Sequence, residues 1–516
     1  MALITPVTQP LTASQAGHLL RRATFGPSPA QIKAFTGITP AVAVARLLAE
    51  TPAPNAPLNP TTGQTFVDIP FDNALDGLWR SYLKNWYIGQ MVREGVSLQE
   101  GMTLFWQNHF VSTLATVGDA RFIHRQYLTL RKNAFGNFRT FVIEMTKDPA
   151  MLLYLNGNQN VVNSPNENYG RELQELFTIG RSGNYTEDDV KASARVLTGW
   201  NQTGYRNITT AAITTTFTAN RHDTNDKKFS AAYGNTVIKG RTGATAGDDE
   251  LADMVDMILR QPETARFICR KLYRWFINDT VTADIETNFI EPLAQVFINS
   301  KFEMKPVMGA LLTSEHFYDT GLIGAIIKSP LQLIVGAFRQ FDIALPDPVK
   351  DPVNFNNAGN FLMGRAREQT QEVLEQPTVF GWPAYYDTGF YQKWISANTL
   401  ALRAYFTDLF VKGSIRVNNV RYGPDSLAIV RALPTPADPV KLINDLTANF
   451  FATPLTTTQK DFLIDNVLIP GLPRYEWTTQ WQEFMADQSN AKKTALTMKL
   501  DALFLYLFRM AEYQMC

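Results

Sequence analysis

Signals that start a helix recur along this chain, and they constrain its fold more than any other feature. A Ser or Thr followed three residues later by Gln or an acidic residue forms a capping box, in which both side chains accept hydrogen bonds from backbone N–H groups. Such pairs precede helical patterns at Ser28–Gln31, Ser97–Glu100 and Ser164–Glu167, and the segment from Thr186 to Asp189 is expected to cap another helix. We therefore expect a mainly α protein that forms a large multi-helical body.

Apolar periodicity extends the helical pattern beyond these starts. Side chains that face a core recur every three or four residues along an amphipathic helix. This spacing predicts helices over 249–260, 262–278, 284–299, 304–314 and 329–342, with more helices in 72–155 and 438–516. Most of the chain is therefore expected to be helical.

Residues 201–245 interrupt this pattern. The stretch 208–217 is rich in Thr and β-branched residues, and 236–240 has the composition of a short strand. Both features are typical of β structure. We therefore expect a small β-hairpin-like insertion near 205–240 in an otherwise helical protein.

A segment rich in Pro and Asn, 346–360, indicates where the chain divides, since such residues favour irregular connections. We expect a helical core over 1–345 that carries the β segment 201–245. The remaining residues, 346–516, are expected to form a C-terminal helical part packed on the same body.

Composition excludes several functional classes. The chain has 48 basic and 48 acidic residues and a formal net charge of +0, which argues against nonspecific nucleic-acid binding. It has no apolar run of the length that a membrane helix needs. The two cysteines, Cys269 and Cys516, and five histidines form no Cys/His cluster, so the sequence requires no structural zinc or other cofactor.

The stretch from Ser164 to Gly180 combines a well-marked helix with side chains that can do chemistry. Ser164 suits an N-cap, and Gly180 suits the left-handed residue that ends a helix. At about 100° per residue, Asn168, Glu172 and Glu175 fall within about 60° of one another on one face. Two carboxylates on one face can share a proton or divide the acid and base roles of a reaction.

The same face has a simpler interpretation. Arg171 is four residues from Glu167 and four from Glu175. Ion pairs at this spacing stabilise an exposed helix by about 0.2–0.5 kcal/mol each. The polar face can therefore be an ordinary solvated surface, with Glu167 acting only as a cap.

Three other places carry candidate site residues. His109 lies on an apolar helix face, where it is either a packed core residue or a histidine held against a carboxylate. His222 and Asp223 belong to a dense polar segment, 221–229, which is either a site or a polar turn. Trp382 lies in a Gly-Trp-Pro loop that either forms the wall of a pocket or packs in the core.

Several segments together resemble one known family. They are Leu19–Gly26, Phe105–Phe110, Asp148–Leu152, Pro165–Tyr169, Arg171–Leu173, Glu175–Phe177, Asn184–Thr186, Leu197–Trp200, Arg221–Asp223, Ser329–Pro330 and Gly381–Pro383. In this order they closely resemble the large bacterial family called "domain of unknown function 1800", from about residue 11 to the C-terminus.

The resemblance implies a single large bacterial module that is often made with an export signal, and hence a periplasmic or extracellular location. The first residues of this chain lack the basic end and apolar run of a signal peptide. The family commonly has His where this chain has Gln107. This difference weakens the hypothesis of a metal site that needs a His-x-His pair on this helix, and leaves His109 as the matching position.

Our first hypothesis is an exported hydrolase that cleaves a glycan or another polar extracellular polymer. Glu172 and Glu175 would be the general acid and base, with His109 or His222 tuning or sharing the proton. Paired carboxylates beside aromatic walls suit glycosidic cleavage. Four further residues are expected to bind substrate: Asn168, Arg171, Asp223 and Trp382.

Two alternatives remain open from the sequence. The first is a non-catalytic helical module at the cell surface, which binds a protein or glycan partner through the aromatic loop. The second is a divalent metal site formed by Glu172, Glu175 and either His109 or His222, because Glu and His on facing helices can hold such an ion.

Overall fold

The computed structural model describes residues 3–181, 183–386, 390–418 and 420–516. Helices make up most of this part of the chain, and its strands form three separate two-stranded sheets. The expectation of a mainly α fold with a small β insertion is therefore confirmed. None of the helices in these ranges is long and apolar enough to cross a membrane.

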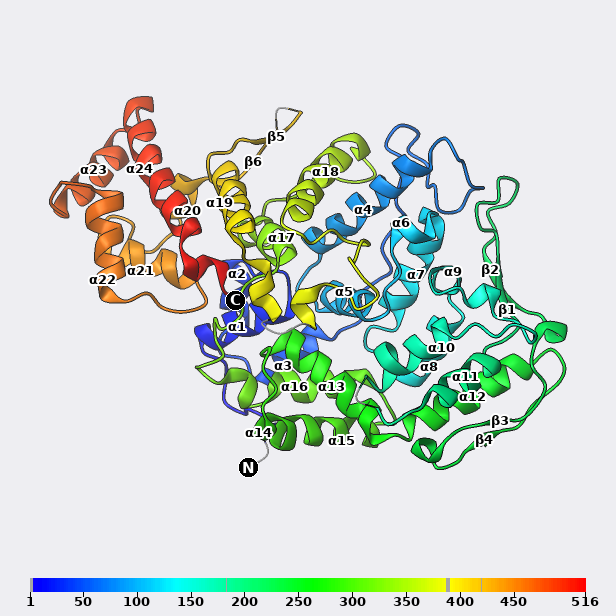
Figure 1. The fold of residues 1–516 in the computed structure, drawn as a ribbon. Helices are drawn as coiled ribbons and strands as arrows, with labels where there is room; N and C mark the ends of the chain where they lie inside the picture. Colours follow the sequence, from blue (N-terminus) through cyan, green and yellow to red (C-terminus); the bar gives the residue numbers. More distant parts are fainter. Residues whose placement is uncertain (1–2, 182, 387–389, 419) are drawn as a thin grey trace.

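The N-terminal third of the chain packs around one helix, α5, which lies near the centre of the molecule (Figure 1). Local side chains explain where several of these helices start, since Thr12, Thr113, Asp119, Asn137 and Asp148 each accept a hydrogen bond from a first-turn N–H group. The helices are α1 (Ala13–Ala23), α2 (Pro29–Phe35), α3 (Pro40–Leu47), α4 (Asp76–Arg93), α5 (Gln99–His109), α6 (Leu114–Val117), α7 (Ala120–Lys132), α8 (Phe138–Thr146) and α9 (Pro149–Tyr154).

The central helix begins later than its sequence predicts. It starts as α10 (Asn168–Glu172), continues directly as a π-helix, η2 (Leu173–Thr178), and is followed by α11 (Glu187–Val196). The expected N-cap at Ser164 is therefore wrong. The expected end is confirmed, because Gly180 has a left-handed φ of 89°. The expected cap of the next helix is also confirmed, because Thr186 caps α11 and forms a capping box with Asp189.

The β insertion consists of two hairpins instead of one. Strands β1 (Trp200–Thr203) and β2 (Thr214–Phe217) pair antiparallel, with Trp200 opposite Phe217. The second pair is β3 (Lys227–Lys228) with β4 (Val237–Ile238). The third sheet, β5 (Ile415–Val417) with β6 (Val420–Tyr422), lies in the C-terminal part and was not expected.

The helices predicted between residues 249 and 342 are confirmed to within a few residues. They are α12 (Ala246–Leu259), α13 (Pro262–Phe276), α14 (Ala283–Ile285), the π-helix η5 (Glu286–Ile290), α15 (Glu291–Asn299), α16 (Met304–Thr313) and α17 (Pro330–Gln340). The predicted starts at 262 and 329 are explained by Pro262 and Pro330, each at the first helical position.

The expected linker at 346–360 is wrong over most of its length, because α18 (Pro352–Glu368) starts there. Asp351 caps this helix by accepting a hydrogen bond from the Asn354 N–H group. Helix α18 packs along α4, where the Asn85 amide donates to Asn360 at 2.8 Å. The remaining helices are α19 (Ala397–Val411), α20 (Ser426–Arg431), α21 (Pro439–Phe450), α22 (Thr457–Phe462), α23 (Tyr475–Ala486) and α24 (Asn490–Arg509).

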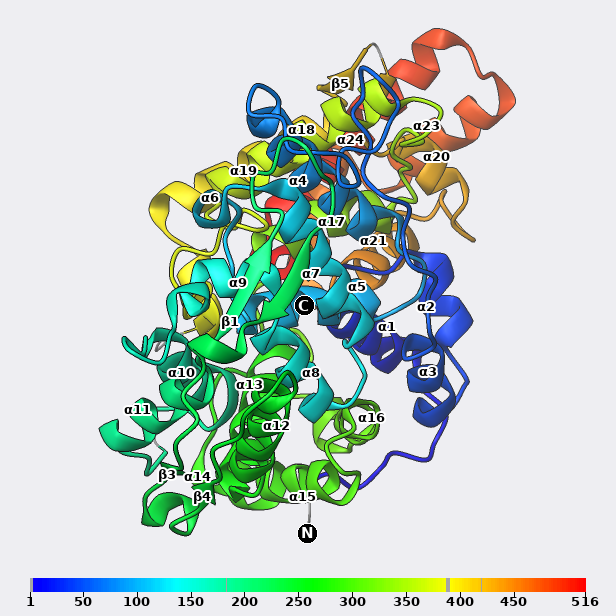
Figure 2. The same ribbon diagram turned by 90° about the vertical axis from the view of Figure 1, so that its right-hand side faces the viewer.

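The buried apolar side chains form two large clusters that meet at α5. One cluster includes Leu104 of α5 and extends along the chain from Phe25 to Tyr513, so it contains residues from both sides of position 345. The other includes Trp106 of α5 and is built mainly from the N-terminal helices, the central helix, α11 and α12–α16. In both views α23 and α24 lie at one end of the molecule and α15 at the opposite end (Figures 1 and 2). Helix α5 thus joins the two halves of the core.

Candidate active site

The carboxylates of Glu172 and Glu175 lie on one helix whose other face is buried. Gly170 allows α10 to approach α11 closely, since a Cβ atom there would lie 3.2 Å from the Ala194 nitrogen. Leu173 and Phe177 are fully buried, whereas Glu172 and Glu175 are half-buried. The helix therefore has the packing face and the polar face that the sequence predicts.

Glu175 lies between two arginines. Its carboxylate oxygens are 3.8 Å from Arg171 Nη1 and 3.8 Å from Arg181 Nε. Arg171 also pairs with Glu167 at 3.3 Å and with Glu187 at 2.6 Å. The negative charge of Glu175 is therefore balanced locally by two guanidinium groups.

Glu172 has a different environment, although it is only one turn away. Within the described ranges, no Lys or Arg nitrogen lies within 4.0 Å of its carboxylate. Partial burial and the nearby charge of Glu175 raise the pKa of Glu172. The two carboxyl groups thus differ in their surroundings: Glu175 has two arginines nearby, whereas Glu172 has burial and a negative charge. A difference of this kind can separate an acid from a base at one site.

Two tyrosines flank the carboxylates. Burial, and then the charge of Glu172, raises the pKa of Tyr154. Burial, and then the charge of Glu175 with a hydrogen bond to its carboxylate, raises the pKa of Tyr185. Each carboxylate therefore has a tyrosine hydroxyl close enough to feel its charge.

His109 lies behind this helix and does not hydrogen-bond either carboxylate. Its Nε2 is 3.0 Å from the Phe177 carbonyl oxygen, and its Nδ1 is 2.8 Å from Lys271 Nζ. Because a carbonyl only accepts, Nε2 carries the proton and Nδ1 accepts from the lysine. Burial, followed by the charge of Lys271, lowers the pKa of His109 well below its ordinary value, so the imidazole is neutral.

The position of Phe177 explains why its carbonyl is available. It belongs to the last turn of η2, where carbonyl groups have no partner inside the helix. His109 supplies that partner from α5. The ring therefore fixes the end of the helix that carries Glu175, and His109 is a positioning residue.

Lys271, on α13, is the residue at this site that the sequence analysis missed. Its Nζ lies 5.3 Å from the centre of the Phe267 ring and contacts His109, with no carboxylate within ion-pair distance in the described ranges. Burial, followed by the charge of Arg274, lowers the pKa of Lys271 to about 7. Its position in an Arg- and Lys-rich helix gives no local signal, because its partner is 162 residues away.

Lys271 is expected to behave as an amine that loses its proton near neutral pH. Competitive acylation with acetic anhydride, followed by peptide mass spectrometry, should give a labelling midpoint near pH 7 for Lys271. Lys132, with 68% of its side chain exposed, serves as the reference. Because the unfolded chain holds this proton more tightly, the contribution of Lys271 to the free energy of unfolding should rise between pH about 7 and about 10.4. Equal midpoints for the two lysines would contradict this expectation.

His222 and Asp223 lie in a separate buried cluster around α12. His222 Nδ1 is 2.9 Å from the Thr198 carbonyl oxygen, and its Nε2 is 3.2 Å from Glu250 Oε1. Asp223 accepts from Arg195 Nε at 2.6 Å. The structure therefore gives these two residues structural partners and does not bring His222 to the carboxylate pair.

Trp382 is also part of the core. Its side chain is 1% exposed, and its backbone N–H group donates to Asn108 Oδ1 at 2.8 Å. The same loop instead presents Phe380, whose ring lies 4.3 Å from the Arg181 guanidinium. The loop thus contributes an aromatic side chain near Glu175, but through Phe380.

Asn168, a further predicted substrate-binding residue, is exposed at the start of α10.

The described residues do not assemble a metal site. No three His, Cys, Asp or Glu side chains within these ranges come together in a way that could hold an ion. In particular, both ring nitrogens of His109 and both of His222 lie against protein atoms.

These features define a class of protein: a large, mainly α-helical protein with a carboxylate pair on a helix that changes from α to π. The model of one family, described as "Protein of unknown function (DUF1800)", matches residues 18–515. The chain belongs to this family. Comparison with curated proteins and with solved structures finds no match.

Proposed function

We propose that the protein is a hydrolase in which Glu172 is the general acid and Glu175 the general base or nucleophile. The observation that carries this proposal is the contrast between the two carboxyl groups. Glu175 lies 3.8 Å from each of two arginines, whereas burial and the neighbouring charge favour the protonated form of Glu172. A protonated acid beside a charged carboxylate is the arrangement that hydrolysis of a glycosidic bond requires.

Each group has a defined task in this mechanism. Glu172 donates a proton to the oxygen of the leaving group, which prevents the build-up of negative charge on that oxygen. Glu175 either activates a water molecule or attacks the substrate carbon itself. Arg171 and Arg181, each 3.8 Å from it, help to orient the Glu175 carboxylate, and His109 holds the helix end through the Phe177 carbonyl.

The proposed substrate is a glycan or a similar polar polymer. Tyr154, Tyr185 and Phe380 provide aromatic surface around the carboxylates, and such surfaces pack against the apolar faces of sugar rings. Action outside the cytoplasm, the location that the family resemblance implies, would give the enzyme access to such polymers.

A screen for new reducing ends would first identify a glycan that the wild-type protein cleaves. Separate Glu172→Gln and Glu175→Gln variants would then be assayed on this glycan to test the proposal. We expect each variant to lower kcat by about 10²–10⁴-fold, the usual contribution of a general acid or base. Since Glu172 must be protonated, wild-type activity should fall as pH rises through the raised pKa of Glu172, and Glu172→Gln should remove this limb of the profile.

Glu187→Gln is the matched control. Glu187 pairs with the same Arg171 but has 67% of its side chain exposed, so the control should keep near-normal turnover. Circular dichroism and thermal unfolding would show that all three variants fold. Full turnover in both Glu172→Gln and Glu175→Gln would exclude the carboxylate mechanism and favour a non-catalytic module that binds a protein or glycan.

A further inference from the structure

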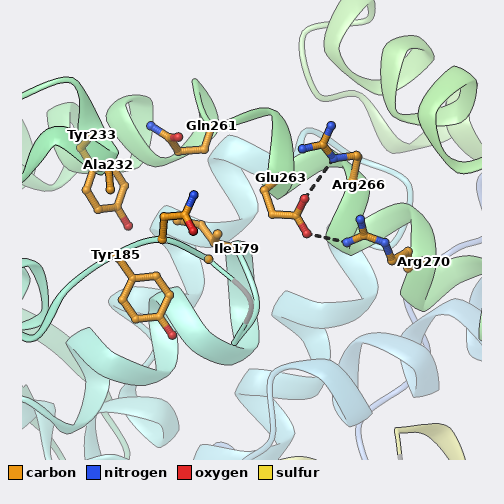
Figure 3. Close-up of a pocket in the computed structure, with 10 residues that line it drawn as sticks. Ile179, Tyr185, Ala232, Tyr233, Gln261, Glu263, Arg266 and Arg270 are labelled. Carbon is orange, nitrogen blue, oxygen red and sulfur yellow. Dashed lines mark hydrogen bonds and ion pairs between the residues drawn. The ribbon is translucent and has the colours of Figure 1, made fainter. Parts of the chain in front are cut away.

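A polar pocket of about 310 Å³ lies beside the chain that follows η2 (Figure 3). This volume is at the lower end of the range of about 300–1,000 Å³ for small-molecule sites. Three segments line it: the chain after η2, the turn before β4, and the start of α13. The lining residues are Ile179, Gly183, Asn184, Tyr185, Ala232, Tyr233, Gln261, Glu263, Arg266 and Arg270.

Tyr185 links the pocket to the proposed reaction site. Its side chain lines the pocket, and it lies close enough to Glu175 for the charge of that carboxylate to raise the pKa of its hydroxyl. Ile179, which also lines the pocket, directly follows the π-helix that carries Glu175. A ligand in the pocket would therefore lie one side chain away from Glu175.

The charges around the pocket compensate one another. Glu263 accepts from Arg266 Nε at 3.0 Å and from Arg270 Nη1 at 2.5 Å (Figure 3). Arg270 also pairs with Glu286 at 2.6 Å. Because two guanidinium groups face two carboxylates, the pocket favours neither an anion nor a cation, and a neutral polar ligand fits it best.

The remaining lining groups suit a ligand that has hydroxyl groups on an apolar ring. The amides of Asn184 and Gln261 offer both donors and acceptors, as hydroxyl groups require. Tyr185 and Tyr233 supply aromatic surface, and Tyr233 is fixed because its hydroxyl donates to Gln174 Oε1 at 2.5 Å. Such rigid aromatic side chains with adjacent polar groups match the two faces of a sugar ring.

We propose that this pocket is a subsite for one neutral sugar unit of the polymer that is cleaved at Glu172 and Glu175. This inference rests on the proposed hydrolase function and adds the substrate class at this position: an uncharged sugar.

Direct binding tests the subsite. Cellotetraose, xylotetraose, maltotetraose, chitotetraose and the charged tetragalacturonate would be titrated by calorimetry into the full-length Glu172→Gln protein, which should not cleave them. We expect at least one neutral sugar to bind. Its Kd should rise at least tenfold when Ala232→Trp fills the pocket, and also when Gln261→Ala removes a hydrogen-bonding group.

Ala231→Trp is the matched control, because Ala231 lies in the same turn but is exposed. It should leave the Kd unchanged. If Ala232→Trp does not fold, Gln261→Ala provides the same test without added bulk.

Three results would overturn the subsite: no binding of any neutral sugar, equal binding by the pocket variants, or equally tight binding of tetragalacturonate. Failure of the subsite proposal is distinguishable from failure of the proposed hydrolase function. Loss of turnover in Glu172→Gln with unaltered binding in Ala232→Trp would reject only the subsite. Retained turnover in Glu172→Gln with weakened binding in Ala232→Trp would reject only the mechanism and support a sugar site here.

Discussion

Glu250→Ala is expected to lower the free energy of unfolding by about 3–5 kcal/mol, because it leaves a buried ammonium group without its counter-charge. Glu250 Oε2 lies 2.5 Å from Lys227 Nζ, and both side chains are 0% exposed. The second oxygen lies 3.2 Å from His222 Nε2 and accepts from the Arg241 N–H group at 2.7 Å. The substitution therefore removes the one side chain that three groups of this cluster share as their partner.

Asp253→Ala provides the comparison on the same helix. Asp253 pairs with Arg241 at 2.6 Å, but 46% of its side chain is exposed, so its loss should cost less than about 1 kcal/mol. Urea unfolding at pH 7 measures both variants. A double variant, Lys227→Met with Glu250→Leu, should recover part of the loss because no unpaired charge is buried. Similar small losses for Glu250→Ala and Asp253→Ala would show that the buried cluster is not needed for stability.

Gly381→Ala should lower the free energy of unfolding by about 2–4 kcal/mol through backbone strain and a lost hydrogen bond. Gly381 has a φ of 92°, a region that residues with a Cβ rarely adopt. A Cβ atom there would overlap Asn108 Oδ1 and lie 2.8 Å from the Asn108 carbonyl oxygen. The loop would have to move away from α5 and release the bond between the Trp382 N–H group and Asn108.

Gly364→Ala is the control for this substitution. Gly364 lies inside α18, and a Cβ atom there would meet nothing within 4 Å. Alanine favours helices, so this variant should gain about 0.5–1 kcal/mol. Thermal unfolding and tryptophan fluorescence would compare the two, and an unchanged Tm for Gly381→Ala would argue against tight packing of the loop on α5.

Local sequence signals predicted most helices because their causes are local. Pro262 and Pro330 mark two starts, and apolar periodicity marks the buried faces that follow. The start of the central helix could not be read in this way. Asn160 Oδ1 accepts from the Asn166 N–H group, and Asn166 Oδ1 accepts from the Asn168 N–H group. These side-chain bonds hold the residues before Asn168 outside the helix despite a good capping pattern.

The candidate site was predictable only where its parts share one helix. Glu172 and Glu175 could be placed together because helical spacing fixes their relative positions. The partners of His109 and His222, which are Lys271 and Glu250, come from distant segments. The local sequence gives no reason to pair these histidines with Lys271 and Glu250 instead of with a carboxylate of the central helix. Burial and tertiary packing determine which partners they have.

The contact between His109 and Phe177 has a consequence for how the molecule moves. The last turn of a helix is ordinarily its least stable part, which opens and closes without the rest of the protein. Here the imidazole of α5 and the amine of Lys271 tie that turn to the centre of the core. The segment that carries Glu175 is therefore expected to belong to the same cooperative unit as the interior, so that thermal fluctuations at the helix end do not separate Glu172 and Glu175 from the core.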